Sequence, residues 1–372
     1  MSGGRPYADP CVPLSGSFSL RPPPRHPALD AARGFAVLAM VIGHTLHALL
    51  SPSARENEWV QHYWSLRGLT APLFLLVSGW AVVAAMDRRT EGSRGIYGRL
   101  VRRALLLIFL GYLLRWPGWE AVQALGWSEA LMAQLFAFDA LQCIGASLLV
   151  GATVLSLARG SRIRTLVLGV LAVGIVLASP AVWQFGPNLP IALRQATGMD
   201  GSQFTLFPWA SYFFVGSLLA WLLRMLRPGW PQGVVLAALG AGMLGATLKL
   251  PADWAPTSAW LVAFRVGQGL IVLAVANFAP VRLTRLLAPL GLLSLWVYLL
   301  HLPVVYGWAG TPGLSDRVGP TLELVPALLA GLGLLAACYA VARLLRRLRR
   351  LTFPWRPAAT TVGTSFGRSQ RV

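Results

Sequence analysis

Residues 34–54 read GFAVLAMVIGHTLHALLSPSA, a stretch without a single Lys, Arg, Asp or Glu. An α-helix needs about 20 consecutive apolar residues to cross the hydrocarbon core of a bilayer, which is about 30 Å thick. Two histidines, His44 and His47, interrupt this otherwise apolar run. The stretch therefore predicts a membrane-spanning helix that carries polar groups inside the bilayer.

Nine further stretches share this apolar character, although three of them contain one Arg or His. All ten are residues 34–54, 68–86, 104–119, 140–158, 165–183, 207–223, 233–248, 258–280, 288–308 and 324–342. We expect an all-α polytopic membrane protein, a bundle of about ten transmembrane helices. No internal repeat is evident along the chain.

The composition supports a membrane protein and excludes several other classes. The 372 residues are 56% hydrophobic and 12% charged, with a mean hydropathy of +0.61. Soluble globular chains carry about 25% charged residues, so this chain cannot cover its apolar residues with a polar surface. An ordinary soluble enzyme, a disordered chain and a coiled coil are thereby excluded.

The charged residues alternate from loop to loop. Every second loop is basic: its arginines are Arg88, Arg89, Arg94, Arg99, Arg102, Arg103, Arg159, Arg162, Arg164, Arg224, Arg227, Arg282, Arg285, Arg343, Arg346, Arg347, Arg349 and Arg350. The other loops carry Glu56, Glu58, Glu120, Glu129, Asp200, Asp253 and Asp316. Cytoplasmic loops collect Lys and Arg, so both termini are expected in the cytoplasm. This accounts for most of the net charge of +19 without a nucleic-acid partner.

The chain divides into three parts. Residues 1–27 and 352–372, rich in Pro, Ser, Thr and Arg, are expected to be disordered cytoplasmic tails. Residues 28–351 form the transmembrane domain. The first 27 residues lack the apolar region of a signal peptide, so the first apolar stretch is expected to remain as a membrane anchor.

Ionisable residues inside membrane spans are costly and usually face a bundle interior or a wet cavity. Five polar residues fall at a common depth in the outer half of the bilayer when the helix rise of 1.5 Å per residue is applied. They are His44, Asp139, Gln142, Arg265 and His301. We expect them to line a single water-filled pocket that opens outward.

Structural explanations compete with this hypothesis. His47 could be a simple interhelical hydrogen-bonding residue. Asp139 and Arg265 could neutralise each other as a structural pair. A metal site on His44 and His47 lacks a third ligand, and the three cysteines lie far apart, so no metal is expected.

Five motifs, in order, resemble integral membrane acyltransferases. They are RHPALDAARGFAVLAMVIGH (25–44), TAPLFLLVSG (70–79), DALQCIG (139–145), FPW (207–209) with Gly216, and LGLLSLWVYLLH (290–301). The chain resembles bacterial relatives of the heparan-alpha-glucosaminide N-acetyltransferase catalytic domain, and this resemblance implies the cytoplasmic (inner) membrane. The wider type-3 membrane acyltransferases share the first and last motifs.

The resemblance implies transfer of an acyl group, usually acetyl, from acyl-CoA to a hydroxyl or amine outside the cytoplasm. Acyl-CoA would be a co-substrate, with no tightly bound cofactor. His44 suits the role of general base or acyl carrier. Arg265 or His301 would stabilise the oxyanion, and Asp139 would orient one of these cations.

Arg33, at the cytoplasmic boundary, would bind the CoA phosphates, with Gln142 as a second donor-binding residue. A topology anchor is the alternative role of Arg33. Expected partners are acyl-CoA, an envelope glycan or small-molecule acceptor, and membrane lipids. The sequence leaves the oligomeric state open, a homodimer included.

Buried His, Asp and Arg residues also build proton relays, so a secondary transporter or proton-coupled carrier is the competing hypothesis. Paired broken helices and an inverted repeat, which many transporters contain, are not evident in the sequence. A non-catalytic membrane scaffold is a third hypothesis, against which the five converging polar residues argue.

Overall fold

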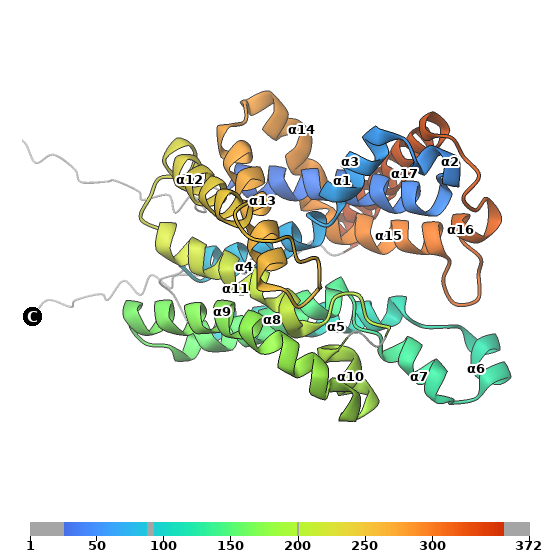
Figure 1. The fold of residues 1–372 in the computed structure, drawn as a ribbon, viewed down its shortest axis with the longest axis horizontal. Coiled ribbons are helices and arrows are strands. Elements are labelled where there is room, and N and C mark those ends of the chain that lie inside the picture. Colours follow the sequence, from blue (N-terminus) through green and yellow to red (C-terminus); the bar gives the residue numbers. More distant parts are fainter. Residues whose placement is uncertain (1–25, 88–92, 199–200, 353–372) are drawn as a thin grey trace, which may run out of the picture.

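A computed structural model describes residues 26–87, 93–198 and 201–352, and every regular element in these ranges is a helix (Figure 1). The long helices are α1 (Pro27–Leu49), α4 (Thr70–Asp87), α5 (Ser93–Leu114), α8 (Ala140–Leu157), α9 (Ser161–Phe185), α11 (Leu206–Leu223), α12 (Trp230–Thr247), α13 (Ala259–Phe278), α14 (Val281–Leu292), α15 (Ser294–Tyr306) and α17 (Leu324–Thr352). Short helices connect them: α2 (Pro52–Arg55), α3 (Glu58–Arg67), α6 (Trp119–Leu125), α7 (Glu129–Phe136), η1 (Gly186–Asn188), α10 (Ile191–Thr197) and α16 (Leu314–Arg317). The two expected tails lie almost entirely outside the described residues.

Six of these helices are long and apolar enough to cross a membrane: α1, α8, α9, α11, α13 and α17. The bent pair α14–α15 brings the number to seven if it forms one span. The three remaining expected stretches lie in α4, α5 and α12, which are helical but do not reach the same length and apolarity. The structure thus supports a multi-pass membrane protein with about six spanning helices, while the expected ten spans stay a prediction.

The first helix is placed differently from the sequence expectation of residues 34–54. It begins at Pro27, whose fixed φ suits a first helical position, and it ends at Leu49. Ser51 then caps the short helix α2 by accepting a hydrogen bond from the Ala54 amide. The chain therefore turns at Leu50 and Ser51 and leaves residues 52–54 outside α1.

The ninth expected span is also not one straight helix. The axes of α14 and α15 differ by 65° at a break near Leu293. Pro289 lies inside α14, where its ring removes a backbone hydrogen bond and favours a bend. The bend lets α14 pack along α1, with which it makes extensive contacts (Figure 1).

Glycines allow α1 and α14 to approach closely. A Cβ atom at Gly34 would overlap the carbonyl oxygen of Leu287, and one at Gly291 would overlap the carbonyl oxygen of Asp30. Small residues permit this kind of backbone contact between membrane helices. The contact fixes the first turns of α1, where Arg33 lies.

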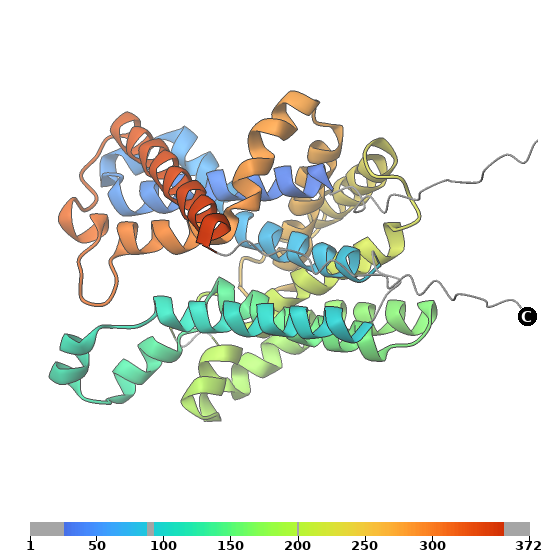
Figure 2. The ribbon, with the colours of Figure 1, turned by 180° about the vertical axis from the view of Figure 1, so that it is seen from behind.

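The apolar core surrounds α4 and α11, which pack against each other through Gly216 and the backbone of Leu76. Phe213 and Phe214 of α11 are fully buried at its centre. On the other side of α1, α17 contacts both α1 and α15, and it crosses in front of them in Figure 2. These contacts hold α1 and α15 side by side.

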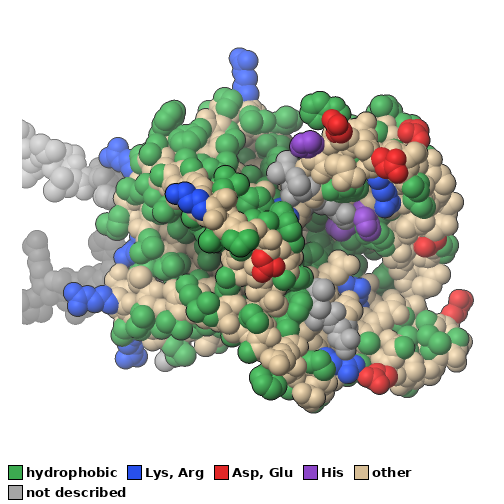
Figure 3. Space-filling view, in the orientation of Figure 1, with side chains coloured by type: hydrophobic (Ala, Val, Ile, Leu, Met, Phe, Trp, Pro, Cys, Tyr) green, Lys and Arg blue, Asp and Glu red, His purple; other side chains and the backbone are tan. Residues whose placement is uncertain are grey.

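Charge is distributed unevenly along the bundle. In Figure 3 most of the visible Lys and Arg side chains lie at one end, and most of the Asp and Glu side chains lie at the other. The acidic end is the one that carries the short helices α2, α6, α7 and α16 (Figure 1). This asymmetry matches the alternation of basic and acidic loops, whereas the side of the membrane that each end faces stays a prediction.

Candidate functional site

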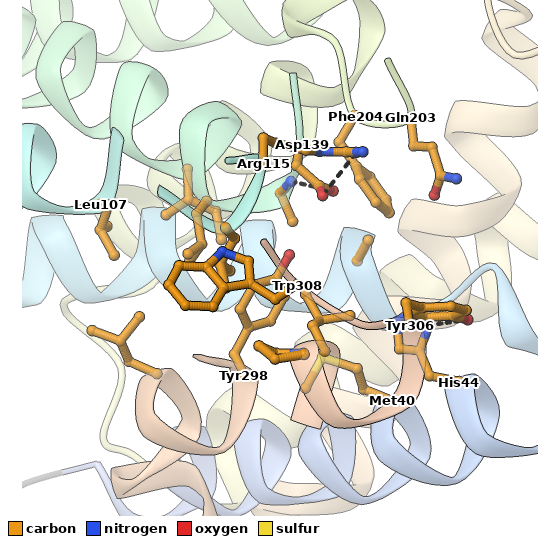
Figure 4. Close-up of a pocket in the computed structure, with 18 of the residues that line it drawn as sticks. Met40, His44, Leu107, Arg115, Asp139, Gln203, Phe204, Tyr298, Tyr306 and Trp308 are labelled. Carbon is orange, nitrogen blue, oxygen red and sulfur yellow. Dashed lines mark hydrogen bonds and ion pairs between the residues drawn. The ribbon is translucent and has the colours of Figure 1, made fainter. Parts of the chain in front are cut away.

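A cavity of about 830 Å³ lies between α1, α4, α5, α8 and α15 (Figure 4). Cofactor and small-molecule sites commonly occupy about 300–1,000 Å³, so its size fits a ligand site. His44 and His47 of α1, Arg115 and Asp139, and Tyr306 of α15 are among its polar lining residues. The cavity combines ionisable side chains with apolar walls.

A tyrosine hydroxyl joins two histidines on the wall of this cavity. The Oη atom of Tyr306 lies 3.0 Å from Nδ1 of His44 and 3.3 Å from Nδ1 of His47. The two histidines are three residues apart on α1 and therefore share one helix face. The ring of His44 also meets the Tyr306 ring edge-on, with centroids 5.5 Å apart (Figure 4).

His301 lies next to His44, as their common depth predicted: the two ring centroids are 5.4 Å apart. His301 is fully buried, and its Nδ1 donates to the carbonyl of Val297, 2.8 Å away, one turn earlier on α15. Its Nε2 is therefore the lone-pair nitrogen, and it is buried without a hydrogen-bond partner in the described part of the chain. A neutral His301 in this form cannot donate a hydrogen bond to an oxyanion.

Asp139 is held by an arginine that the sequence analysis did not assign to it. Nη2 of Arg115 lies 3.0 Å from the Asp139 carboxylate, and both side chains are mostly buried. Asp139 also caps α8, accepting from the Ala140 amide. The anticipated pair of Asp139 with Arg265 does not form: the guanidinium of Arg265 donates instead to Gln268, 2.9 Å away.

Gln142 completes the cap of α8. Its Oε1 accepts from the backbone amide of Asp139 at 3.3 Å, and its Nε2 donates to the carbonyl of Ala137 at 3.3 Å. The side chain is fully buried and does not line the cavity. Its expected contact with the donor thus lacks structural support, and its observed role is to hold Asp139 in place.

Two arginines lie on the cavity wall well away from the histidines. Arg33 of α1 and Arg103 of α5 both line the large cavity. Arg33 lies 3.7 Å from the Asp30 carboxylate and donates to the carbonyl of Val77 at 3.4 Å, both long contacts. It precedes His44 by eleven residues, which is about 16 Å along a helix. The cavity therefore joins a doubly basic region to the histidines.

A second cavity of about 660 Å³ adjoins the first at His44. The two share six residues: Met40, His44, Thr70, Ala71, Gln203 and Phe204. The second cavity adds Arg265 and the aromatic side chains of Trp64 and Trp209. The single pocket expected from the sequence is thus two adjoining cavities, with Asp139 in one, Arg265 in the other and His44 in both.

The comparison with known families decides between the competing hypotheses. Residues 26–343 match the acyltransferase domain family, the type-3 acyltransferases. The chain belongs to this family. The match covers most of the chain and favours an acyltransferase over a transporter or a scaffold, whereas the narrower likeness to the heparan-alpha-glucosaminide enzymes is not confirmed. No curated protein matches the chain.

The candidate site contains further residues whose pattern in the sequence does not single them out. Tyr306 and Tyr298 lie among the apolar residues of α15, where a tyrosine is easily taken for an interfacial side chain. Trp308 follows α15, and its Nε1 donates to the carbonyl of Leu113 at 2.9 Å, which ties the 307–313 loop to α5. Only the packing of α15 beside α1 shows that these residues belong to the site.

The described helices of the acyltransferase contain no group of three His, Cys, Asp or Glu side chains arranged to hold a metal ion. The groups that could hold a ligand are instead the cationic and polar side chains on the two cavity walls. Arg33 and Arg103 suit anionic oxygen atoms, because a guanidinium donates in a fork that matches phosphate.

Proposed function

We propose that this membrane acyltransferase moves an acyl group, in the first place acetyl, from acyl-CoA to a hydroxyl or amine of an envelope glycan or small molecule. The acceptor lies on the non-cytoplasmic side of the inner membrane. The observation that carries the proposal is the large cavity, whose walls include Arg33, Arg103 and the histidine cluster. Arg33 precedes His44 by about 16 Å along α1.

The donor occupies the large cavity in this proposal. Its phosphates bind at Arg33 and Arg103, and its pantetheine arm extends along Met40 and Phe74 toward His44, all of which line the cavity. Arg33 is suited to a ligand, because its contacts with Asp30 and Val77 are both long. A phosphate would offer shorter, charge-assisted hydrogen bonds.

The acceptor enters through the second cavity, so that donor and acceptor meet at His44. Nε2 of His44 takes the proton of the acceptor hydroxyl or amine while that group attacks the thioester carbonyl. The C–S bond then breaks, and the thiolate of CoA leaves with the proton returned by His44. Attack by His44 itself, to form an acyl-histidine, is the covalent version of the same reaction.

The developing oxyanion needs donors that are in place before the reaction. Arg265 lines the second cavity, where its guanidinium lies near the faces of Phe264 and Trp254, at 5.6 and 5.8 Å from the ring centroids. We assign oxyanion stabilisation to Arg265 and not to His301, because the buried His301 would first have to be protonated. Asp139 orients Arg115 in the large cavity.

The test is acetyl transfer by the purified protein in lipid nanodiscs. Radiolabelled acetyl-CoA is supplied on its own or with an envelope extract, and label is followed into the glycan and lipid fractions. The proposal expects saturable binding of acetyl-CoA and label transfer that depends on the extract. Absence of acetyl-CoA binding would refute it.

A further inference from the structure

The arrangement around Tyr306 limits where hydrogen atoms can lie. The Tyr306 hydroxyl is within hydrogen-bond distance of Nδ1 of both His44 and His47, at 3.0 and 3.3 Å. A tyrosine hydroxyl carries one hydrogen, and each neutral imidazole carries one hydrogen on one of its two nitrogens. The hydroxyl can donate to only one of the two Nδ1 atoms, so the other Nδ1 must carry a hydrogen and donate to the hydroxyl oxygen.

The proposed role of His44 selects one of the two arrangements. A general base needs a lone pair that can reach the acceptor, and Nδ1 of His44 is directed at Tyr306. Nε2 is therefore the basic nitrogen, and Nδ1 carries the hydrogen. Tyr306 then accepts from His44 and donates to Nδ1 of His47, which gives the chain of hydrogen bonds a single direction.

We propose that Tyr306 and His47 form a proton relay for His44, an inference that rests on the proposed acyl transfer. When Nε2 of His44 takes the acceptor proton, the Nδ1 hydrogen of His44 moves to the Tyr306 oxygen. The Tyr306 hydrogen moves at the same time to Nδ1 of His47. His44 is then neutral and His47 is an imidazolium, and the reverse movement returns the proton through His44 to the leaving thiolate.

The surroundings favour His47 as the place that holds the charge. His47 is exposed, whereas His44 is half-buried, and a hydrated cation costs less than a desolvated one. His47 also lies in the last turn of α1, where the helix dipole stabilises a positive charge. Each site therefore has a distinct task, base chemistry at His44 and charge storage at His47.

Several charged groups from the neighbouring elements face this cluster. Arg55, which donates to the carbonyls of His47 and Leu50 at 2.8 and 3.0 Å, opposes a charge on His47. The other groups on the walls of the two cavities are the Arg115–Asp139 pair, Asp316, Arg265, Arg33 and Arg103, with the buried His301 behind His44. Asp316 of α16 is an acidic side chain on the wall of the large cavity, and its charge favours the imidazolium.

Tyr306→Phe tests the relay, because it removes only the hydroxyl. With acetyl-CoA as donor and envelope extract as acceptor, we expect kcat to fall by about 10²-fold, the lower end of the range for acid–base catalysis, with the KM for acetyl-CoA almost unchanged. Tyr339→Phe, on α17 away from both cavities, is the matched control and should keep wild-type kcat. A Tyr306→Phe enzyme with wild-type kcat would overturn the proposal, as would a parallel loss in the control.

His47→Ala provides a second test, because a purely structural role of His47 would not produce the result that the relay predicts. His47 is exposed, so added imidazole should restore much of the lost kcat in His47→Ala but not in the double variant with Tyr306→Phe. In wild-type enzyme the dependence of kcat on the D₂O fraction should be curved, because several protons move together, and it should be linear in Tyr306→Phe. Rescue of the double variant by imidazole would contradict the relay. The same dependence of kcat on the D₂O fraction in wild type and Tyr306→Phe would contradict it as well.

Nitrogen-15 NMR of histidine-labelled protein separates this inference from the proposed function, because it needs no acyl transfer. We expect His44 with its hydrogen on Nδ1 in the wild type, and a shift toward the Nε2 form in Tyr306→Phe. A wild-type His44 with its hydrogen on Nε2 would refute the relay even if acyl transfer is observed. The expected tautomers without any acetyl-CoA binding would instead refute the proposed function.

Discussion

Replacing Arg33 by Gln should weaken the binding of acetyl-CoA while leaving the binding of acetyl-pantetheine, which lacks the nucleotide phosphates, unchanged. Arg33 is on the wall of the large cavity, about 16 Å along α1 from His44, so its charge can reach only the remote part of the donor. The contacts that it loses inside the protein are long ones, to Asp30 at 3.7 Å and to Val77 at 3.4 Å.

The magnitude follows from the kind of hydrogen bond. A hydrogen bond to a charged group contributes about 1.5–3 kcal/mol, and each 1.4 kcal/mol is a factor of ten in affinity. One lost guanidinium–phosphate contact should therefore raise the Kd for acetyl-CoA by about 10- to 150-fold. Gln keeps part of the side-chain length and polarity, so the loss reports on charge more than on volume.

The assay is equilibrium binding of the two donors to wild type, Arg33→Gln and the control Arg282→Gln in nanodiscs. Arg282 lies on the exposed face of α14 and lines neither cavity. We expect acetyl-CoA to bind Arg33→Gln more weakly than the other two proteins, and acetyl-pantetheine to bind all three proteins with the same affinity. An equal loss of affinity for both donors would show that Arg33 shapes the cavity instead of binding phosphate. Equal affinities of all three proteins for both donors would show that Arg33 does not bind the donor.

Further predictions concern stability and topology. Arg115→Ala removes the ion partner of the largely buried Asp139 carboxylate and should lower the stability by about 1–3 kcal/mol, which is visible as a lower Tm. The double variant with Asp139→Asn should recover part of the lost stability, because it removes the unpaired charge. Gly216→Val, whose new side chain would overlap the α4 backbone, should lower Tm by an amount corresponding to about 1–3 kcal/mol, whereas a wild-type Tm would contradict the packing. In a cysteine-free background, Ser53→Cys and Ser161→Cys should react with an impermeant maleimide from opposite sides of the membrane, and labelling from the same side would refute the topology.

Sequence reasoning was strongest where a local property decides the structure. Apolar stretches free of charge located the helices, because crossing a bilayer sets both length and composition. Depth along a helix is also local, since it follows from the rise per residue, and it predicts one level for His44 and His301. Their contact, with ring centroids 5.4 Å apart, additionally depends on the packing of α15 beside α1. Helix position and depth along a helix both follow without knowing which helices are neighbours.

Other features depend on tertiary contacts and could not be predicted. The partner of Asp139 is Arg115 and not Arg265, because α5 lies beside α8 whereas α13 borders the other cavity. Tyr306 gave no signal in sequence, since its importance comes from the position of its hydroxyl between two histidines of another helix. The division into two cavities is likewise a property of the packed bundle.

The measurement that tests the central claim most directly is the rate of acetyl transfer by His44→Ala, beside its Tm. The matched control is His62→Ala, an exposed histidine of α3. If His44 is the base, its removal should lower kcat by about 10²–10⁴-fold, with Tm and the Kd for acetyl-CoA unchanged and the control fully active. Full activity in His44→Ala, or a loss of activity that merely follows a lowered Tm, would show that His44 is a structural hydrogen-bonding residue and not the catalytic base.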